Sequence, residues 1–401
     1  EDIICLDGRR SIISDGYTLK LFVYVKLTKT TKMSTYFGIF YSIFETAVAV
    51  WPKRRIRWTF LADFVNDMRQ YGRISWSDLT NVCIIAVVFT LLRSLLTSYM
   101  FKPFAASMKF TPKNCRKFPE SMWKFLYYLI MYIYTCIVLF GKHYNLYEDP
   151  RTCWSVWSVG MSVPSDIYYL YCIQASFYLH SIYATVFMDT WRKDSIAMLI
   201  HHVLTVFLLC FSFAIRYYKV GVLVLFLHDL CDVLLEFTKL CVCWKTRDNK
   251  KYYWPEVLIN TGFLMFSFSW FYFRLYVFPY KVLYPSGHYA VRVHPEAPFY
   301  YFFNGLLLFL FAMNLWWFHF IILLIWRVVT GQSTEVEDTR EVGTPQEEQG
   351  SEDVDIQETH KMNGTSHPVR NGSAKSSETV ENGYVQDIHL RQRLTDNSSQ
   401  R

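Results

Sequence analysis

Histidines within apolar stretches are the residues of this chain best suited to chemistry. His201 and His202 are adjacent, and His228 and Asp229 lie in the next apolar stretch. Imidazole can accept and return a proton near neutral pH or act as a nucleophile, and a neighbouring carboxylate can orient it. Ionisable side chains are costly inside a bilayer and usually face a protein interior or a water-filled cavity. The pattern therefore predicts a buried site for acid–base or acyl-transfer chemistry.

The second stretch carries a polar stripe. His228, Asp232 and Glu236 are spaced four residues apart, so they share one face of a helix. Lys239 follows Glu236 by three residues and can neutralise it. Asp229 lies about 100° around the helix from His228 and widens the stripe. This stripe can meet the histidine pair where the two helices run antiparallel.

Two alternatives to a catalytic site apply to these residues. They could hydrogen-bond the helices to one another, but several ionisable groups on adjacent helices favour a functional site. His180 and His319, each isolated on its own span, are expected to be structural. Histidine and aspartate are also good metal ligands. The H-x-x-H-H and H-x-x-x-H clusters of di-iron membrane enzymes do not occur here, and no metal is expected.

The elements that must position these residues are membrane-spanning helices. Of the 401 residues, 52% are hydrophobic, and most lie in apolar runs of about twenty residues, the length needed to cross a bilayer. The fold class is therefore predicted to be all-α, a polytopic membrane protein with about seven transmembrane helices. The predicted spans are Leu79–Phe101, Met122–Phe140, Ile167–Met188, Ile196–Ile215, Val220–Leu240, Val257–Phe278 and Phe299–Val329.

The two ends of the chain differ from the apolar body. Residues 1–32 precede Met33, the first methionine, and are expected not to be native. Tyr36–Val50 is predicted to be an interfacial helix, with an eighth crossing as the alternative. Residues 1–78 are therefore expected to form a lumenal or interfacial region. Residues 332–401 are polar and partly acidic, and this composition predicts a disordered tail.

Loop charges predict the orientation, because Lys and Arg are in excess on the cytosolic side. The first, third and fifth loops carry more of them than the second, fourth and sixth. Residues 79–116, the first span and its basic loop, are therefore expected to lead into the cytosol, and the tail to be cytosolic. The basic cluster Lys53–Arg57 argues against this orientation because it would be lumenal.

The order of these polar residues resembles the longevity-assurance motif of ceramide synthases, which are membrane enzymes with a TLC domain. The matching residues are His201, His202, Thr205, Ser212, Gly221, His228, Asp229, Asp232, Glu236 and Lys239. The resemblance runs from about Lys117 to Gly331. It implies that residues 117–331 form a six-helix TLC catalytic domain.

Within this family the chain is most similar to the branch that lacks a homeodomain-like insert. The loop Lys102–Glu120 has nineteen residues, too few for that three-helix module, and no nucleic-acid partner is expected. Arg216 stands where many family members have Asn, and Phe213 where many have Tyr. Both departures fit this branch.

The resemblance implies transfer of a fatty acyl group from acyl-CoA to the amine of a sphingoid base in the endoplasmic reticulum membrane. Acyl-CoA would be a co-substrate, and no cofactor is expected. The branch implies stearoyl-CoA, and chain-length choice is attributed to the connection between the last two spans, Pro279–Pro298. A homodimer or a heterodimer with other ceramide synthases is the implied assembly.

Two mechanisms stay open. In one, His201 attacks the thioester to give an acyl-imidazole that the amine captures. His202 or His228, oriented by Asp229 and Asp232, would then manage the amine proton. In the other, the amine attacks directly and the histidine pair acts as general base. The expected substrate contacts are Thr205, Ser212, Glu236 and Lys239.

Two rival classes of protein share some of these features. A non-enzymatic TLC-domain protein, lipid-sensing or associated with the translocon, would be expected to lose the paired histidine and the His-Asp step, which this chain retains. A transporter could use intramembrane His and Asp as a proton relay. It would predict inverted repeats, and none is evident in the sequence.

Overall fold

The computed structural model of the protein describes residues 36–50, 60–141, 144–248 and 250–330. Three segments discussed above lie outside the described residues: residues 1–32, the basic cluster Lys53–Arg57 and the predicted tail 332–401.

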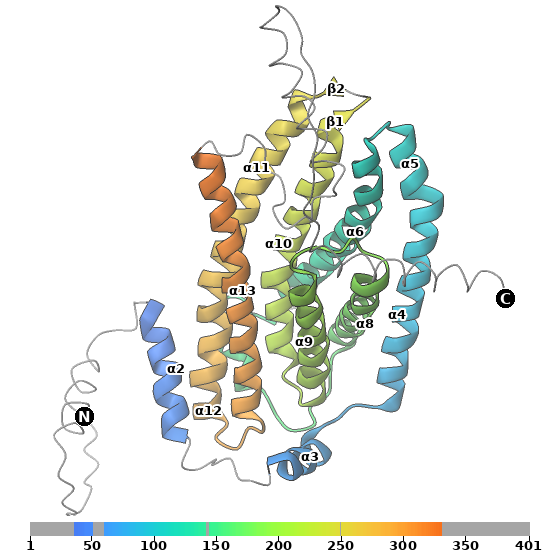
Figure 1. Cartoon of the computed structure of the whole chain (residues 1–401). Coiled ribbons are helices and arrows are strands. Elements are labelled where there is room, and N and C mark those ends of the chain that lie inside the picture. The colour runs from blue at the N-terminus through green and yellow to red at the C-terminus, as the bar shows by residue number, and fades with distance from the viewer. Residues whose placement is uncertain (1–35, 51–59, 142–143, 249, 331–401) are drawn as a thin grey trace, which may run out of the picture. The chain divides into compact units, whose positions relative to one another are not determined.

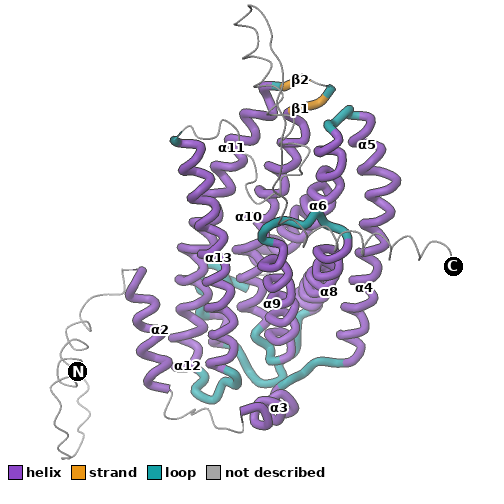
Figure 2. The backbone as a smooth tube through the Cα atoms, in the orientation of Figure 1, coloured by secondary structure: helices purple, strands orange, loops and turns teal. Residues whose placement is uncertain are grey.

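Nearly all described residues are helical, as Figure 2 shows, which confirms the all-α class. In chain order the elements are α2 (Tyr36–Val50), α3 (Phe60–Tyr71), α4 (Trp76–Leu96), η2 (Thr97–Phe101), α5 (Lys102–Ser107), α6 (Pro112–Gly141), α7 (Thr152–Ser155), α8 (Ser165–Phe187), α9 (Ser195–Ala214), α10 (Tyr218–Lys245), β1 (Thr246–Arg247), β2 (Lys250–Lys251), α11 (Tyr253–Ser269), η3 (Trp270–Val277), η4 (Pro279–Leu283), η5 (Pro285–Tyr289), α12 (Ala290–Val293) and α13 (Tyr300–Val329). The η elements are π-helical, and the two short strands pair antiparallel.

Each of the seven predicted spans coincides with a long helix. Four helical stretches among the described residues are long and apolar enough to cross a membrane: Trp76–Ser107, α6, α9 and α13. The helix α10 is equally long but carries Asp229, Asp232 and Glu236 within its apolar length. The polytopic membrane architecture is confirmed, and the charged helix is the one that the site uses.

Consecutive long helices run in opposite directions, and their connections gather at two ends (Figure 1). At one end Phe110, in the first loop, forms a β-bridge with Arg247, in the fifth. At the other end the Trp157 indole N–H, in the second loop, donates to the Ile215 carbonyl oxygen, in the fourth, at 3.2 Å. Odd and even loops therefore separate as the alternation of spans predicts.

The polar helix α10 is surrounded by other helices. It packs most extensively against α6 and α11, and also against α9 and η3. The helix α8 lies between α4 and α9. In contrast, α4 lies at the edge of the bundle in Figure 1 and exposes a row of apolar side chains: Ile84, Val87, Val88, Leu91 and Leu95. Apolar exposure on α4 and polar burial on α10 are the arrangement expected in lipid.

Two predicted connections are more helical than expected. The loop Lys102–Glu120 contains α5 and the first turns of α6, so only a short link remains. At the other connection, α11 continues through the π-helical turns into α12 and ends at Val293. Most of Pro279–Pro298 is therefore helical. Proline normally interrupts a helix because it lacks an N–H and crowds the preceding turn, but wide π-helical turns accommodate Pro279 and Pro285.

The helices α2 and α3 lie before the predicted spans. With 15 residues, α2 is about 22 Å long at 1.5 Å per residue, less than the ~30 Å of a bilayer core. Its Ile39 and Ile43 are buried, and it packs against η4 and η5. Phe64 of α3 contacts Phe211 of α9 and two rings at the start of α13. An eighth crossing is therefore not supported by the length of α2.

Candidate functional site

The helices α9 and α10 bring the two histidine motifs together. They are joined by three residues, and Arg216 in this link adopts a left-handed conformation with φ 66°. The Tyr217 N–H donates to the Ser212 carbonyl oxygen at 2.7 Å, which closes the turn tightly. Because the helices then run antiparallel, His201 and His228 come to face the same cavity.

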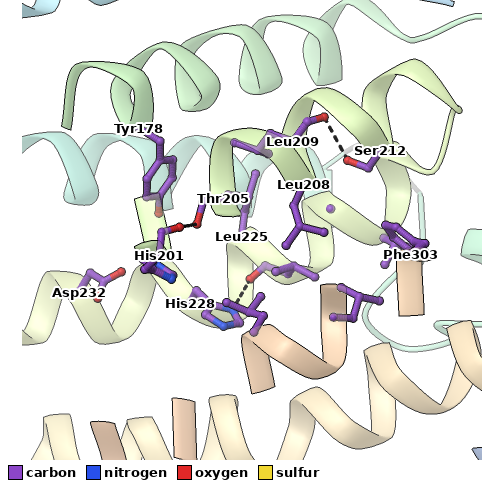
Figure 3. A pocket seen from close by; sticks show the side chains of 15 residues that line it. Tyr178, His201, Thr205, Leu208, Leu209, Ser212, Leu225, His228, Asp232 and Phe303 are labelled. Carbon is purple, nitrogen blue, oxygen red and sulfur yellow. Dashed lines mark hydrogen bonds between the residues drawn. The ribbon is translucent and has the colours of Figure 1, made fainter. Parts of the chain in front are cut away.

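That cavity has about 570 Å³ of empty space, part of it open to the surroundings, and lies between α8, α9, α10 and α13 (Figure 3). Its polar side chains are His201, His228, Asp232, Thr205, Ser212 and Tyr178. The rest of its wall is apolar and includes Leu208, Leu209, Val224, Leu225, Phe303, Leu307 and Leu310. His201 and Ser212 are eleven residues apart on α9, about 16 Å along the helix. The cavity is thus an elongated apolar space with a polar end.

A close approach of two helices shapes the wall near Ser212. Gly221 of α10 lines the cavity, and a Cβ atom built on it would lie 1.8 Å from the Tyr171 hydroxyl of α8. That hydroxyl donates to the Tyr218 carbonyl oxygen at 2.8 Å and lies 3.2 Å from the Ser212 Oγ. Glycine is required here because any side chain would displace Tyr171.

The His201 ring has no hydrogen-bond partner within the described part of the chain. Its Nδ1 is buried and unpartnered. The ring packs edge-on against Trp317, with centroids 5.3 Å apart, and against Tyr178, at 6.4 Å. Aromatic walls therefore hold the ring in place while its nitrogens stay uncommitted.

The His228 ring is held by hydrogen bonds at both nitrogens. Its Nδ1 lies 2.8 Å from the Val224 carbonyl oxygen, which can only accept, so Nδ1 carries the proton. Its Nε2 lies 3.0 Å from the Asn314 amide nitrogen of α13, which donates to it. His228 is thus fixed as a neutral imidazole with no free nitrogen.

His202, Thr205 and Ser212 occupy different places. His202 is buried outside the cavity wall, and its Nδ1 lies 3.4 Å from the Thr185 Oγ1. The Thr205 hydroxyl lines the cavity and donates to the His201 carbonyl oxygen at 2.8 Å. The Ser212 hydroxyl lies near the other end of the same wall. The structure therefore brings Thr205 and Ser212, but not His202, to the cavity.

The two aspartates do not orient the histidines, contrary to expectation. Asp229 accepts from the Gln174 amide of α8 at 2.8 Å, and its Oδ1 is buried without a partner. Asp232 accepts from Arg274 of η3 at 2.8 Å. The same guanidinium group donates to the His228 carbonyl oxygen at 2.9 Å. Each carboxylate is therefore held by another helix.

Glu236 and Lys239 form an ion pair at 2.7 Å, as their spacing predicts, and neither lines the cavity. Next to them lies a buried to half-buried ionic network that joins α4, α6 and the α8–α9 connection. Its members are Arg93, Glu120, Lys124, Asp189 and Arg192. Because Asp189 and Arg192 lie in the connection that leads into α9, the network anchors the chain just before the histidine pair.

No group of three or more His, Cys, Asp or Glu side chains that could hold a metal ion is found among the described residues. The cavity wall contains two histidines and one aspartate, but Asp232 is paired with Arg274 and His228 has no free nitrogen. The donor set offers acid–base and nucleophilic chemistry at His201.

Sequence reasoning missed four residues of the site: Gln174, Tyr178, Arg274 and Asn314. Arg274 is 3% exposed and Asn314 is fully buried, although both lie in apolar helices. A polar residue inside a predicted span is by itself a signal of function. Applied to every span, that signal would have found Arg274 and Asn314, whereas Tyr178 gives none.

Comparisons with known proteins show what this chain is similar to. Residues 117–323 match the TLC domain family. Human ceramide synthase 1 is 44% identical over 308 residues, which cover 77% of this chain and 85% of the human protein. Ceramide synthase LOH1 of Arabidopsis thaliana is 29% identical over 301 residues, 68% of this chain and 93% of that protein. Human ceramide synthase 4 is 35% identical over 208 residues, 51% of this chain and 49% of that protein.

Proposed function

Because this chain belongs to the TLC-domain family of ceramide synthases, we propose that it transfers a fatty acyl group from acyl-CoA to the amine of a sphingoid base. The observation that carries this proposal is the uncommitted imidazole of His201 at the polar end of an elongated apolar cavity. A fatty acyl chain needs the apolar length, and its carboxyl carbon needs the nucleophile.

The proposed nucleophile is His201. Neutral imidazole attacks a thioester readily when a free ring nitrogen faces the carbonyl carbon. His228 lacks such a nitrogen, and His202 lies outside the cavity wall. The acyl-imidazole would then be captured by the sphingoid amine, whose proton returns to His201. Direct attack by the amine, with His201 as general base, is the alternative mechanism.

The other site residues support this nucleophile. Asn314 and the Val224 carbonyl hold His228 in the wall of the same cavity that His201 lines. Arg274 neutralises Asp232, so the cavity does not carry an isolated carboxylate. The Thr205 and Ser212 hydroxyls, already bonded to α9 carbonyl oxygens, line the path of the acyl chain.

Acyl-CoA is proposed to arrive at the end of the bundle where the odd loops meet. Exposed basic residues gather there: Lys102, Lys109, Lys113, Arg116, Lys250 and Lys251. Their charge suits the phosphates of coenzyme A. This end would be cytosolic, with the tail on the same side, in the endoplasmic reticulum membrane. Stearoyl-CoA is the proposed donor, and dimerisation with the same or another ceramide synthase is the proposed assembly.

The test is incubation of the purified protein with sphinganine and a panel of acyl-CoAs, followed by mass spectrometry of the lipid products. Ceramide formation, highest with stearoyl-CoA, is expected. A second sample with acyl-CoA alone should yield protein acylated on the peptide that contains His201. Failure to form ceramide with any donor, from folded protein, would support a non-enzymatic TLC-domain protein instead. Normal turnover without acylated protein would support direct attack.

A further inference from the structure

We propose that the Tyr178 hydroxyl is a further catalytic group, which stabilises the oxyanion formed when the acyl carbonyl is attacked at His201. This inference rests on the proposed acyltransferase function. Addition to a thioester carbonyl places negative charge on its oxygen, and acyl-transfer enzymes provide hydrogen-bond donors for that atom. The proposed reaction therefore needs a side chain in this cavity that can donate to that oxygen.

The other polar side chains of the cavity wall already have partners. The Thr205 hydroxyl donates to the His201 carbonyl oxygen, and the Ser212 hydroxyl to the Leu209 carbonyl oxygen. The proton on His228 is bonded to Val224. The Asp232 carboxylate can only accept while it is ionised. Within the described cavity wall, the hydroxyl that has no hydrogen-bond partner is that of Tyr178.

The position of Tyr178 suits this role. Tyr178 is 4% exposed, and the centroid of its ring lies 6.4 Å from that of the His201 ring at an interplanar angle of 82°. Figure 3 shows its hydroxyl pointing toward His201, on the side of the cavity that also carries Asp232. Phe177 and the buried face of α8 fix the backbone beneath it. The donor is therefore placed in advance of the reaction, which is what makes such groups effective.

In the proposed reaction the acyl group passes from coenzyme A to His201 and then to the amine. The free His201 nitrogen forms a bond to the thioester carbon, and the carbonyl π electrons move to oxygen, where the Tyr178 O–H donates a hydrogen bond without transferring its proton. The carbonyl re-forms, the C–S bond breaks, and coenzyme A leaves as a thiol with the imidazole proton. The amine then attacks the acyl-imidazole through a second oxyanion. The C–N(imidazole) bond breaks, and the amine proton restores the neutral ring.

One competing donor lies close by. The Trp317 indole N–H is buried without a partner, and its ring packs against His201 on α13. Trp317 does not line the cavity, so its N–H is expected to be screened from the carbonyl oxygen. A Trp317→Phe variant separates the two donors because it keeps an aromatic wall and removes the N–H.

The test is single-turnover kinetics of Tyr178→Phe, measured separately for acylation by acyl-CoA alone and for transfer from acylated protein to sphinganine. We expect both rates to fall by about 10²- to 10³-fold, because both steps form an oxyanion, while the KM for acyl-CoA stays nearly constant. Tyr168→Phe is the matched control, since Tyr168 is also on α8 and its hydroxyl bonds to Asp78 at 3.1 Å, away from the cavity.

Acylation and transfer rates in Tyr178→Phe equal to those of the wild type would overturn the inference, and so would a change in its KM alone. A larger loss of rate in Trp317→Phe than in Tyr178→Phe would also overturn it. Wild-type protein that forms no ceramide would instead refute the proposed function. If Tyr178→Phe does not fold, a variant with 3-fluorotyrosine at position 178 tests the inference instead. This residue keeps the hydroxyl and strengthens it as a hydrogen-bond donor. Both half-reactions should then be faster than in the wild type, and unchanged rates would overturn the inference.

Discussion

His201 and His228 face the same cavity but differ in what holds them. Packing alone holds the His201 ring, between Trp317 and Tyr178, and its nitrogens have no described partner. Hydrogen bonds hold the His228 ring at both nitrogens. A reactive nitrogen has to be free, whereas a wall residue gains stability from being bonded. On this difference we base the proposal that His201 is the nucleophile and that His228 has a supporting role.

The largest expected effect comes from removing the free imidazole. His201→Ala should lower the rate of ceramide formation on the order of 10⁴-fold, the scale seen when a central catalytic group is impaired in acyl transfer. It should also abolish acylated protein, measured by intact-protein mass spectrometry. His228→Ala should lose less activity and still become acylated. Equal losses, or acylation of His201→Ala, would contradict the comparison.

The second-largest effect is expected from removing Arg274, the cation that supports the His228 side of the cavity. Arg274→Leu leaves Asp232, whose side chain is 21% exposed, without its partner. Breaking a fully buried pair costs about 3–5 kcal/mol, and this range is the upper bound here. The free energy of unfolding should fall by no more than that amount, measured by thermal unfolding of the detergent-solubilised protein. The double variant Arg274→Leu with Asp232→Leu should recover much of the loss. A single variant as stable as wild type would mean that the pair is not closed to solvent.

The spacing of residues in the sequence predicts only part of this site. The i, i+4 spacing places His228 and Asp232 on one face, and both line the cavity. Spacing within one helix cannot say which other helix meets that face. The partners Arg274 and Asn314 lie 46 and 86 residues after His228, so only the packing of α10 against η3 and α13 identifies them.

The fold was more predictable than the site for a related reason. Apolar length alone indicates a transmembrane helix, because every backbone group must be bonded within it. All seven predicted spans coincide with helices, and four helical stretches among the described residues are long and apolar enough to cross a membrane. The join Pro279–Pro298 was not predicted as helix, since proline in a sequence indicates an interruption. Its π-helical turns depend on packing against α2, α10 and α13, which no local pattern encodes.

The third effect tests whether His228 depends on its amide partner. Asn314→Leu removes the donor to Nε2 and leaves that nitrogen buried and unbonded, at a cost of about 1–3 kcal/mol. If the same free energy is lost in the transition state, the rate constant of transfer to sphinganine should fall by about 5- to 160-fold. Asn304→Leu is the control, since Asn304 is also buried on α13 but bonds to the Ser286 and Tyr300 carbonyl oxygens. Equal kinetic losses in both variants would show that only packing is affected.

The smallest effect concerns His202, the histidine outside the cavity wall. Thr185 donates its hydroxyl proton to the Ser181 carbonyl oxygen, so its Oγ1 can accept from His202 Nδ1. At 3.4 Å this bond is long, and a hydrogen bond of ordinary length contributes only about 0.5–1.5 kcal/mol. Thr185→Val should therefore slow ceramide formation by no more than about fivefold, whereas Thr185→Ser, which keeps the hydroxyl, should match wild type. A loss as large as that of His201→Ala would place His202 in the chemical step and remove the distinction between a free and a bonded histidine.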